Sequence, residues 1–130
     1  VLILVKNDLA VRANVKVIKD IMDPTIQSVW LHFSHHRIGS NSTLGAFILG
    51  GIYREWTPQL SREESRLRLG SLLDQISKAA GGSRVVIHVD FNVDLDRVDD
   101  GTYYMATLAK SLAECTAAAG LETHTTSHTF

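Results

Sequence analysis

Residues 84–96 read RVVIHVDFNVDLD and join a run of strand-forming apolar residues to a polar group at its end. Residues 84–89 are rich in valine and isoleucine, which predicts a strand buried in a sheet. Because successive side chains of a strand point to opposite faces, Asp90 and Asn92 share one face and Phe91 takes the other. His88 lies two residues before Asp90 and is expected on the same face as Asp90.

A second apolar segment precedes this one and predicts its partner strand. Residues 46–53, AFILGGIY, are apolar nearly throughout, as in a strand covered on both faces. The glycine pair within them, Gly50 and Gly51, indicates a bulge or a close approach of another part of the chain. Residues 61–80 show helical periodicity, and Ser61 followed by Glu64 is typical of a capping box.

Strand, helix and strand over residues 46–89 form a βαβ unit, in which the two strands run parallel and end at the same edge of the sheet. Tyr53 ends one strand and Asp90 ends the other. Ligands bind at this edge in open α/β sheets. The sequence therefore predicts an α/β protein with a polar site built around Tyr53, Asp90 and Asn92.

The other elements are predicted from shorter stretches of sequence. Strands are expected at residues 1–5, more weakly at 15–18, and at 26–33; a turn at 6–8; a loop at 35–42; a helix at about 102–119 that Gly120 ends; and extended chain at 121–130. Gly81 and Gly82 are expected to end the first helix in the left-handed conformation.

Composition limits the class of protein. With 130 residues the chain is long enough for one domain. Its formal net charge of −1 gives no overall basic field, so a nucleic acid would be bound through a local patch. A lone cysteine, Cys115, suits a reducing compartment or a small core position. The start, VLILVKND, has no basic leader and no run is long enough to span a bilayer, so we expect no signal peptide, no membrane partner and an intracellular location, nuclear or cytoplasmic.

A carboxylate beside a carboxamide suits the hydrolysis of phosphate esters. Asp90 can orient or deprotonate a water molecule, or help to hold a divalent metal, and Asn92 can donate to a phosphate oxygen. The alternative without a catalytic role is that Asp90 and Asn92 simply end the strand, because Asp and Asn are common in the turns that follow strands. A calcium loop is excluded, because Leu95 stands where its glycine belongs and Gly101 where its final Glu belongs.

The histidines and the residues after Tyr53 give weaker signals. The six histidines lack the spacing of a zinc site. Arg54 and Trp56, just after Tyr53, suit contacts with a nucleic-acid backbone and a base, or an ordinary loop anchor.

These motifs, in the order GGIYREW, then VVIHVDFNVDLDRVDDGTYY, then GLETHTTSHTF, resemble the endonuclease/exonuclease/phosphatase superfamily. More narrowly, they resemble the endonuclease domain of non-LTR (LINE-type) retrotransposon polyproteins, over essentially the whole chain. The resemblance implies a four-layer α/β sandwich with mixed sheets. It also implies a phosphodiesterase that uses Mg²⁺ to nick DNA, with a reverse transcriptase domain in the same polyprotein.

The resemblance also implies roles for individual residues. Asp90 would orient or deprotonate the attacking water, Asn92 would stabilise the phosphate in the transition state, and Tyr53 would support that phosphate. Thr129 would touch the target strand. No metal ligand is assigned within this chain.

The chain departs from the family pattern in three respects. Val89 replaces a glycine before Asp90, and its bulk is expected to crowd the site. The family's metal-binding Glu and its Ser-Asp-His segment have no equivalent in these residues. We therefore expect a partial domain over 1–130, truncated at both ends, inactive by itself and prone to aggregate through unpaired sheet edges. A phosphatase of the same superfamily, a decayed copy and a non-catalytic α/β binding module stay open as alternatives.

Overall fold

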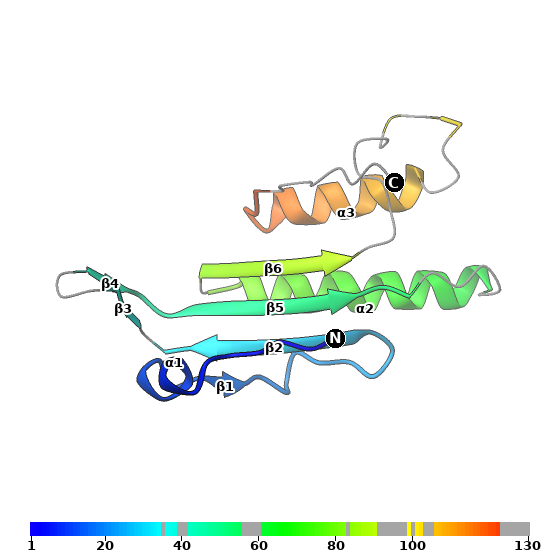
Figure 1. The fold of residues 1–130 in the computed structure, drawn as a ribbon. Helices are drawn as coiled ribbons and strands as arrows, with labels where there is room; N and C mark the ends of the chain where they lie inside the picture. Colours follow the sequence, from blue (N-terminus) through cyan, green and yellow to red (C-terminus); the bar gives the residue numbers. More distant parts are fainter. Residues whose placement is uncertain are drawn as a thin grey trace.

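The structure is a computed structural model that describes residues 1–34, 36–38, 42–55, 61–82, 84–90, 99, 101–102 and 106–122. It confirms the α/β class: helices pack on a mixed four-stranded sheet (Figure 1). The elements in chain order are α1 (Asn7–Arg12), β1 (Lys16–Val17), β2 (Gln27–Phe33), β3 (His36–Ile38), β4 (Ser42–Leu44), β5 (Phe47–Tyr53), α2 (Arg62–Ala80), β6 (Arg84–Asp90) and α3 (Ala106–Ala118).

The sheet has the strand order β1-β2-β5-β6. β1 and β5 each pair with β2 in antiparallel register, and β6 pairs with β5 in parallel. The parallel register is continuous from Phe47 opposite Arg84 to Tyr53 opposite Asp90. This confirms the predicted strand–helix–strand unit and the common edge at which its two strands end.

Helix α2 begins as the sequence predicts. The Glu64 N–H donates to Ser61 Oγ at 3.2 Å, and the Ser61 N–H donates to Glu64 Oε2 at 2.9 Å, which forms the capping box. The helix ends at Ala80, directly before the glycine pair as predicted, but Gly81 has φ −67° and ψ 7° and not the expected left-handed conformation. Gly81 thus continues the right-handed turn one residue further. At the end of α3, in contrast, Gly120 has φ +68°, as expected of a terminating glycine.

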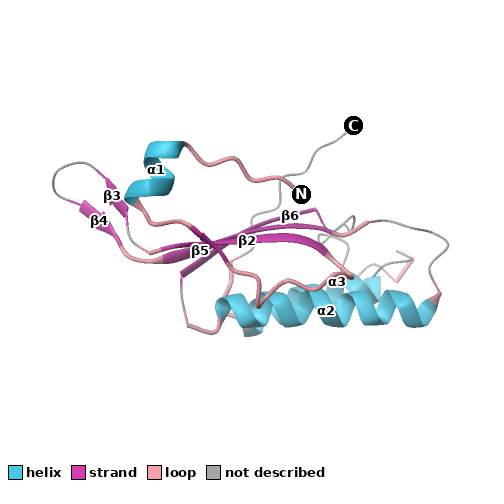
Figure 2. Cartoon of the chain, turned by 90° about the horizontal axis from the view of Figure 1, so that it is seen from below, coloured by secondary structure: helices cyan, strands magenta, loops and turns pink. Residues whose placement is uncertain are grey.

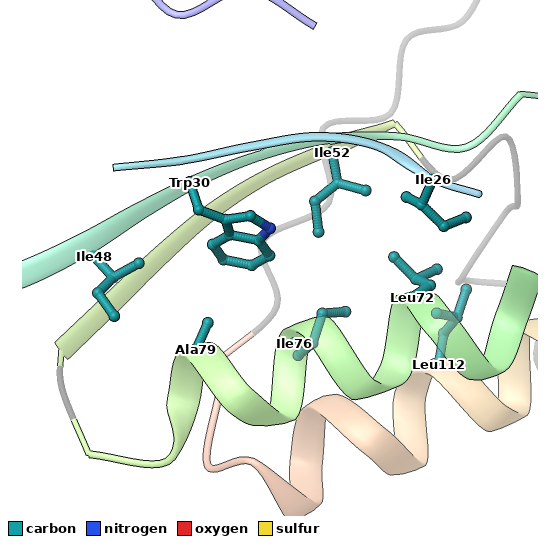
Figure 3. Packing of buried hydrophobic residues seen from close by; sticks show 8 residues of the cluster. All are labelled: Ile26, Trp30, Ile48, Ile52, Leu72, Ile76, Ala79 and Leu112. Carbon is teal, nitrogen blue, oxygen red and sulfur yellow. The ribbon is translucent and has the colours of Figure 1, made fainter. Parts of the chain in front are cut away.

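The main core lies between the sheet and the two longer helices. It is formed by buried side chains from β2, β5, α2, α3 and the segment before β2: Ile26, Trp30, Ile48, Ile52, Leu72, Ile76, Ala79 and Leu112 (Figure 3). Trp30 and Leu72 are fully buried. The apolar periodicity of α2 had predicted this face, since Leu69 and Leu73 also pack against the cluster.

A buried polar contact lies inside this core. Gln75 of α2 is fully buried, and its Oε1 accepts hydrogen bonds from Ser28 Oγ at 2.7 Å and from Trp30 Nε1 at 3.0 Å. Both donors come from β2, so the two bonds fix the position of α2 along that strand.

The opposite face of the sheet is covered by the N-terminal segment and α1 (Figure 2). Ala13, Leu31 and Phe33 are buried there, and Ile3, Val5 and Leu9 pack against them. The rings of Phe33 and Phe47 stack with their centroids 4.4 Å apart.

Two N-terminal predictions are therefore wrong. Residues 1–5 do not form a strand, because their backbone joins no strand of the sheet. Ile3 and Val5 pack on the face of the sheet, while Leu2 and Leu4 are exposed. The turn expected at residues 6–8 is replaced by α1, whose exposed Asp8 and Arg12 lie one turn apart with 3.8 Å between their charged groups.

The loop expected at residues 35–42 is wrong at 36–38 and 42, since β3 and β4 pair in antiparallel register. Residues 35 and 39–41 lie outside the described residues. Strands can pair through their backbones without an apolar pattern, so the mostly polar sequence gave no indication of this pairing. The weak strand expected at 15–18 is reduced to Lys16–Val17. The second long helix is described over Ala106–Ala118, and residues 103–105 lie outside the described residues. Most of the extended segment predicted over 121–130 lies outside the described residues.

Among the described residues, no helix combines the length and the apolar character needed to cross a membrane.

Candidate functional site

The site is centred on the last residue pair of the two parallel strands. Tyr53 ends β5, Asp90 ends β6, and their Cα atoms are register partners. The Arg54 N–H donates to the Asp90 carbonyl oxygen at 2.9 Å, so the pairing continues one step past β5. Because neighbouring strands lie about 4.8 Å apart, the Tyr53 and Asp90 side chains begin side by side.

Strand β6 alternates regularly between the two faces. Val85, Ile87 and Val89 pack against the main core, while the alternate residues are exposed: Arg84, Val86, His88 and Asp90. His88 therefore shares the face of Asp90, as predicted. Val89 points to the opposite face, toward the main core. Its side chain therefore does not crowd Asp90 on the exposed face, contrary to the expectation from the sequence.

A groove with a volume of about 440 Å³ runs along this face. Its wall is the apolar N-terminal segment 1–4, and its floor is the β5 segment 49–53. His88 and Asp90 of β6 border it together with Tyr53, whose side chain is 36% exposed. The groove thus combines a mostly apolar lining with a phenol, an imidazole and a carboxylate at the strand ends.

Gly51 allows the N-terminal segment to lie this close to the sheet. A Cβ atom on Gly51 would stand 2.9 Å from Val1 Cγ1 and 3.2 Å from Ile3 Cδ1. On the other face, a Cβ atom on Gly50 would stand 2.6 Å from Trp30 Cε3. Of the two predictions for this pair, close approach is confirmed on both faces, whereas a bulge is excluded by the unbroken register.

Sequence reasoning identified Tyr53 and Asp90 and placed His88 on the face of Asp90, but it missed the apolar wall of the groove. Residues 1–4 carry the composition of a strand, and nothing local shows that they cross over Gly51. The glycine pair was the available signal, since it pointed to a close approach without identifying the approaching segment.

Other predicted site residues are placed only in part. Arg54 follows Tyr53 and is half-buried. Asn92, Trp56 and Thr129 lie outside the described residues.

The fit of a Mg²⁺ ion can be tested on the described part of the chain. Within it, no group of three or more His, Cys, Asp or Glu side chains is placed to hold a metal. Asp90 is the carboxylate at the strand edge, and one carboxylate does not complete the oxygen shell that Mg²⁺ requires. The described residues alone do not form a magnesium site, and no chemical step is assigned to the metal.

The arrangement nevertheless offers complementary chemistry. The Asp90 carboxylate can accept a proton from a water molecule or orient that water. The Tyr53 hydroxyl can donate a hydrogen bond to an anionic oxygen nearby. Both groups are solvent-accessible and lie on rigid strands, so a ligand in the groove can reach both.

Fold and site together define a small α/β protein whose mixed sheet presents polar side chains at the ends of two parallel strands. Comparisons with protein-family models, with curated proteins and with solved structures found no match to this chain.

Proposed function

We propose that this chain supplies the water-activating and phosphate-binding strand edge of a Mg²⁺-dependent, DNA-nicking endonuclease domain of the kind found in non-LTR retrotransposon polyproteins. The observation that supports it best is the pairing of Tyr53 with Asp90 at the ends of two parallel strands, beside a common groove. A reverse transcriptase domain is the partner expected in the same polyprotein.

In this proposal Asp90 and Tyr53, at the edge of the sheet, have different roles in cleaving a phosphodiester bond. Asp90 takes a proton from water, the water oxygen forms a new bond to phosphorus, and the bond from phosphorus to the 3′ oxygen breaks. The 3′ oxygen takes a proton from solvent water and leaves as a hydroxyl, the phosphate stays on the 5′ side of the nick, and Asp90 returns its proton to solvent. Tyr53 donates to a non-bridging oxygen of the phosphate as negative charge grows on it.

The other proposed roles extend this edge. Asn92 stabilises the same phosphate, while Arg54 and Thr129 contact the DNA backbone and the target strand. Mg²⁺ supplies positive charge at the phosphate when it is bound, with ligands from outside the described residues in addition to any that this edge provides.

The test is nicking of supercoiled plasmid DNA with Mg²⁺ and with EDTA. It compares the 130-residue chain with the product of the whole reading frame that encodes it, and nicking is expected from the latter. General-base removal in Asp90→Asn should lower the rate by about 10²–10⁴-fold. Tyr53→Phe should lower it by about tenfold, the effect of one hydrogen bond to a charged oxygen.

Asp74→Asn is the matched control, because it makes the same chemical change on α2, where the exposed Asp74 pairs with Lys78. It should nick like the unaltered protein. A folded reading-frame product that does not nick, or one that nicks equally well with Asp90→Asn, would contradict the proposal.

A non-catalytic DNA-binding module is the second candidate. It is favoured by the finding that no group of three or more potential metal-ligating side chains occurs in the described segments. Tight binding of DNA without nicking by the whole reading-frame product would select it. Hydrolysis of phosphate monoesters without nicking would instead select a phosphatase of the same superfamily.

A further inference from the structure

His88 has a position that the proposed roles do not use. It lies on β6 two residues before Asp90, on the same face, and its side chain is exposed. Its register partner on β5 is Gly51, over which the side chains of Val1 and Ile3 lie. His88 lines the groove together with this apolar wall, Tyr53 and Asp90.

The chemistry of the groove makes a nitrogen donor at this point useful. Asp90 carries a negative charge and repels a phosphodiester group that approaches the strand edge. An imidazole N–H can donate to a phosphate oxygen and offset this repulsion. Alternate residues of a strand are about 6.6 Å apart, so a phosphodiester group and its flanking sugar can span His88 and Asp90.

We propose that His88 binds the phosphodiester backbone of DNA in this groove and thereby positions the strand against Asp90. The inference rests on the proposed function for the identity of the ligand. His88 is a positioning residue in this scheme, since Asp90 acts on the water and Tyr53 on the phosphate that is cleaved.

His32 provides a matched control within the same sheet. It lies on β2 opposite Ile48, a register position on the face that packs against α2, and it is half-buried. Replacing His32 removes an imidazole from the same sheet but not from the groove. If only the His88 variant loses DNA binding, the loss is due to the position of His88 in the groove and not to the removal of a histidine from the sheet.

The experiment measures DNA affinity by fluorescence anisotropy, with a short fluorescein-labelled duplex in EDTA so that no strand is cut. His88→Ala should raise the Kd about tenfold, the effect of one hydrogen bond to a charged oxygen. His88→Arg keeps an N–H donor at this position and should bind DNA more tightly than His88→Ala, and His32→Ala should leave the affinity unchanged. Urea midpoints should stay equal for both His88 variants, because the side chain is exposed.

Unchanged affinity in His88→Ala, or an equal loss in His32→Ala, would overturn the role of His88. Plasmid nicking by the reading-frame product separates this result from a failure of the proposed function. If Asp90→Asn abolishes nicking while His88→Ala changes neither Kd nor KM, the nuclease proposal stands and the His88 proposal fails. If Asp90→Asn has no effect on nicking but His88→Ala still weakens binding tenfold, the His88 contact stands and the nuclease proposal fails.

Discussion

Gly50→Ala is the substitution for which the structure gives the sharpest expectation. Gly50 lies in β5 directly opposite Trp30 of β2, and an added methyl group would meet the face of the indole ring. The methyl carbon would stand 2.6 Å from Cε3 and 2.9 Å from Cη2, well inside van der Waals contact. Something must therefore shift.

Trp30 has little freedom to shift. It is fully buried, and its Nε1 donates to Gln75 Oε1 at 3.0 Å. Overpacking of this kind costs about 1–3 kcal/mol, and a rigid, hydrogen-bonded ring places the cost near the upper end. Replacing glycine also restricts the unfolded chain, which returns about 0.4–1 kcal/mol. The free energy of unfolding should thus fall by about 2 kcal/mol.

Urea denaturation followed by tryptophan fluorescence measures this loss. With a slope of about 2 kcal/mol per molar urea, typical of a small protein, the midpoint should fall by about 1 M. Gly70→Ala is the control, because no atom lies within 4 Å of its added Cβ and it is in the interior of α2. That variant should gain about 1 kcal/mol from helix propensity.

The free energy of unfolding of Gly51→Ala should lie between those of Gly50→Ala and Gly70→Ala. Its Cβ would meet the side-chain ends of Val1 and Ile3, and Val1 is 48% exposed and can move aside. A Gly50→Ala variant as stable as the unaltered chain, or no less stable than Gly51→Ala, would refute the tight packing of Trp30 on β5.

Further predictions concern the buried amide, the helix cap and the response to acid. Gln75→Leu removes the acceptor of two buried donors, Ser28 Oγ and Trp30 Nε1, and should cost about 3 kcal/mol in urea denaturation; Ser71→Ala, whose contact with Gln75 is 3.5 Å long, should cost less than about 1 kcal/mol. Ser61→Ala removes the cap of α2 and should cost about 1 kcal/mol, with a measurable loss of helical circular dichroism. The hydroxyl and N–H of Ser61 lower the pKa of Glu64, and those of Thr25 lower the pKa of Asp23. For each carboxyl group, the pKa is lower in the folded chain than in the unfolded chain, so the unfolded chain binds more protons at a pH between its folded and unfolded pKa. The stabilisation from these hydrogen bonds is therefore fully present above about pH 4.5, the unfolded pKa of Glu64, and is lost as the pH falls through the lowered values. Urea midpoints at neutral and acid pH should therefore differ less in Asp23→Asn/Glu64→Gln than in the unaltered chain; an equal difference would contradict the assignment.

The sheet and its polar edge were predictable because both depend on local pattern. Apolar runs of strand length bracket an amphipathic helix, and this order alone places Tyr53 and Asp90 at one edge. The capping box that starts α2 is likewise a short-range signal between Ser61 and Glu64. These features need no information about distant parts of the chain.

Features that depend on tertiary contacts were missed or wrongly assigned. Residues 1–5 have strand composition, but they cross the face of the sheet, where Ile3 and Val5 pack and Gly51 leaves room. The polar sequence of β3 and β4 shows no alternation that would reveal a hairpin. Val89 was expected to crowd the site, although the alternation of β6, if applied to it, places it on the core side with Val85 and Ile87.

The two neighbouring glycines show how the fold separates stability from the candidate site. Gly50 accommodates Trp30 and the buried contact with Gln75, whereas Gly51 shapes the groove beside His88, Tyr53 and Asp90. Side chains that pack the main core lie on one face of the parallel strands, and the polar groups lie on the other. Changes to exposed His88 should consequently alter ligand binding without altering the free energy of unfolding. This separation makes the variants of the groove informative, because a loss of binding in a chain of unchanged stability can be assigned to the site itself.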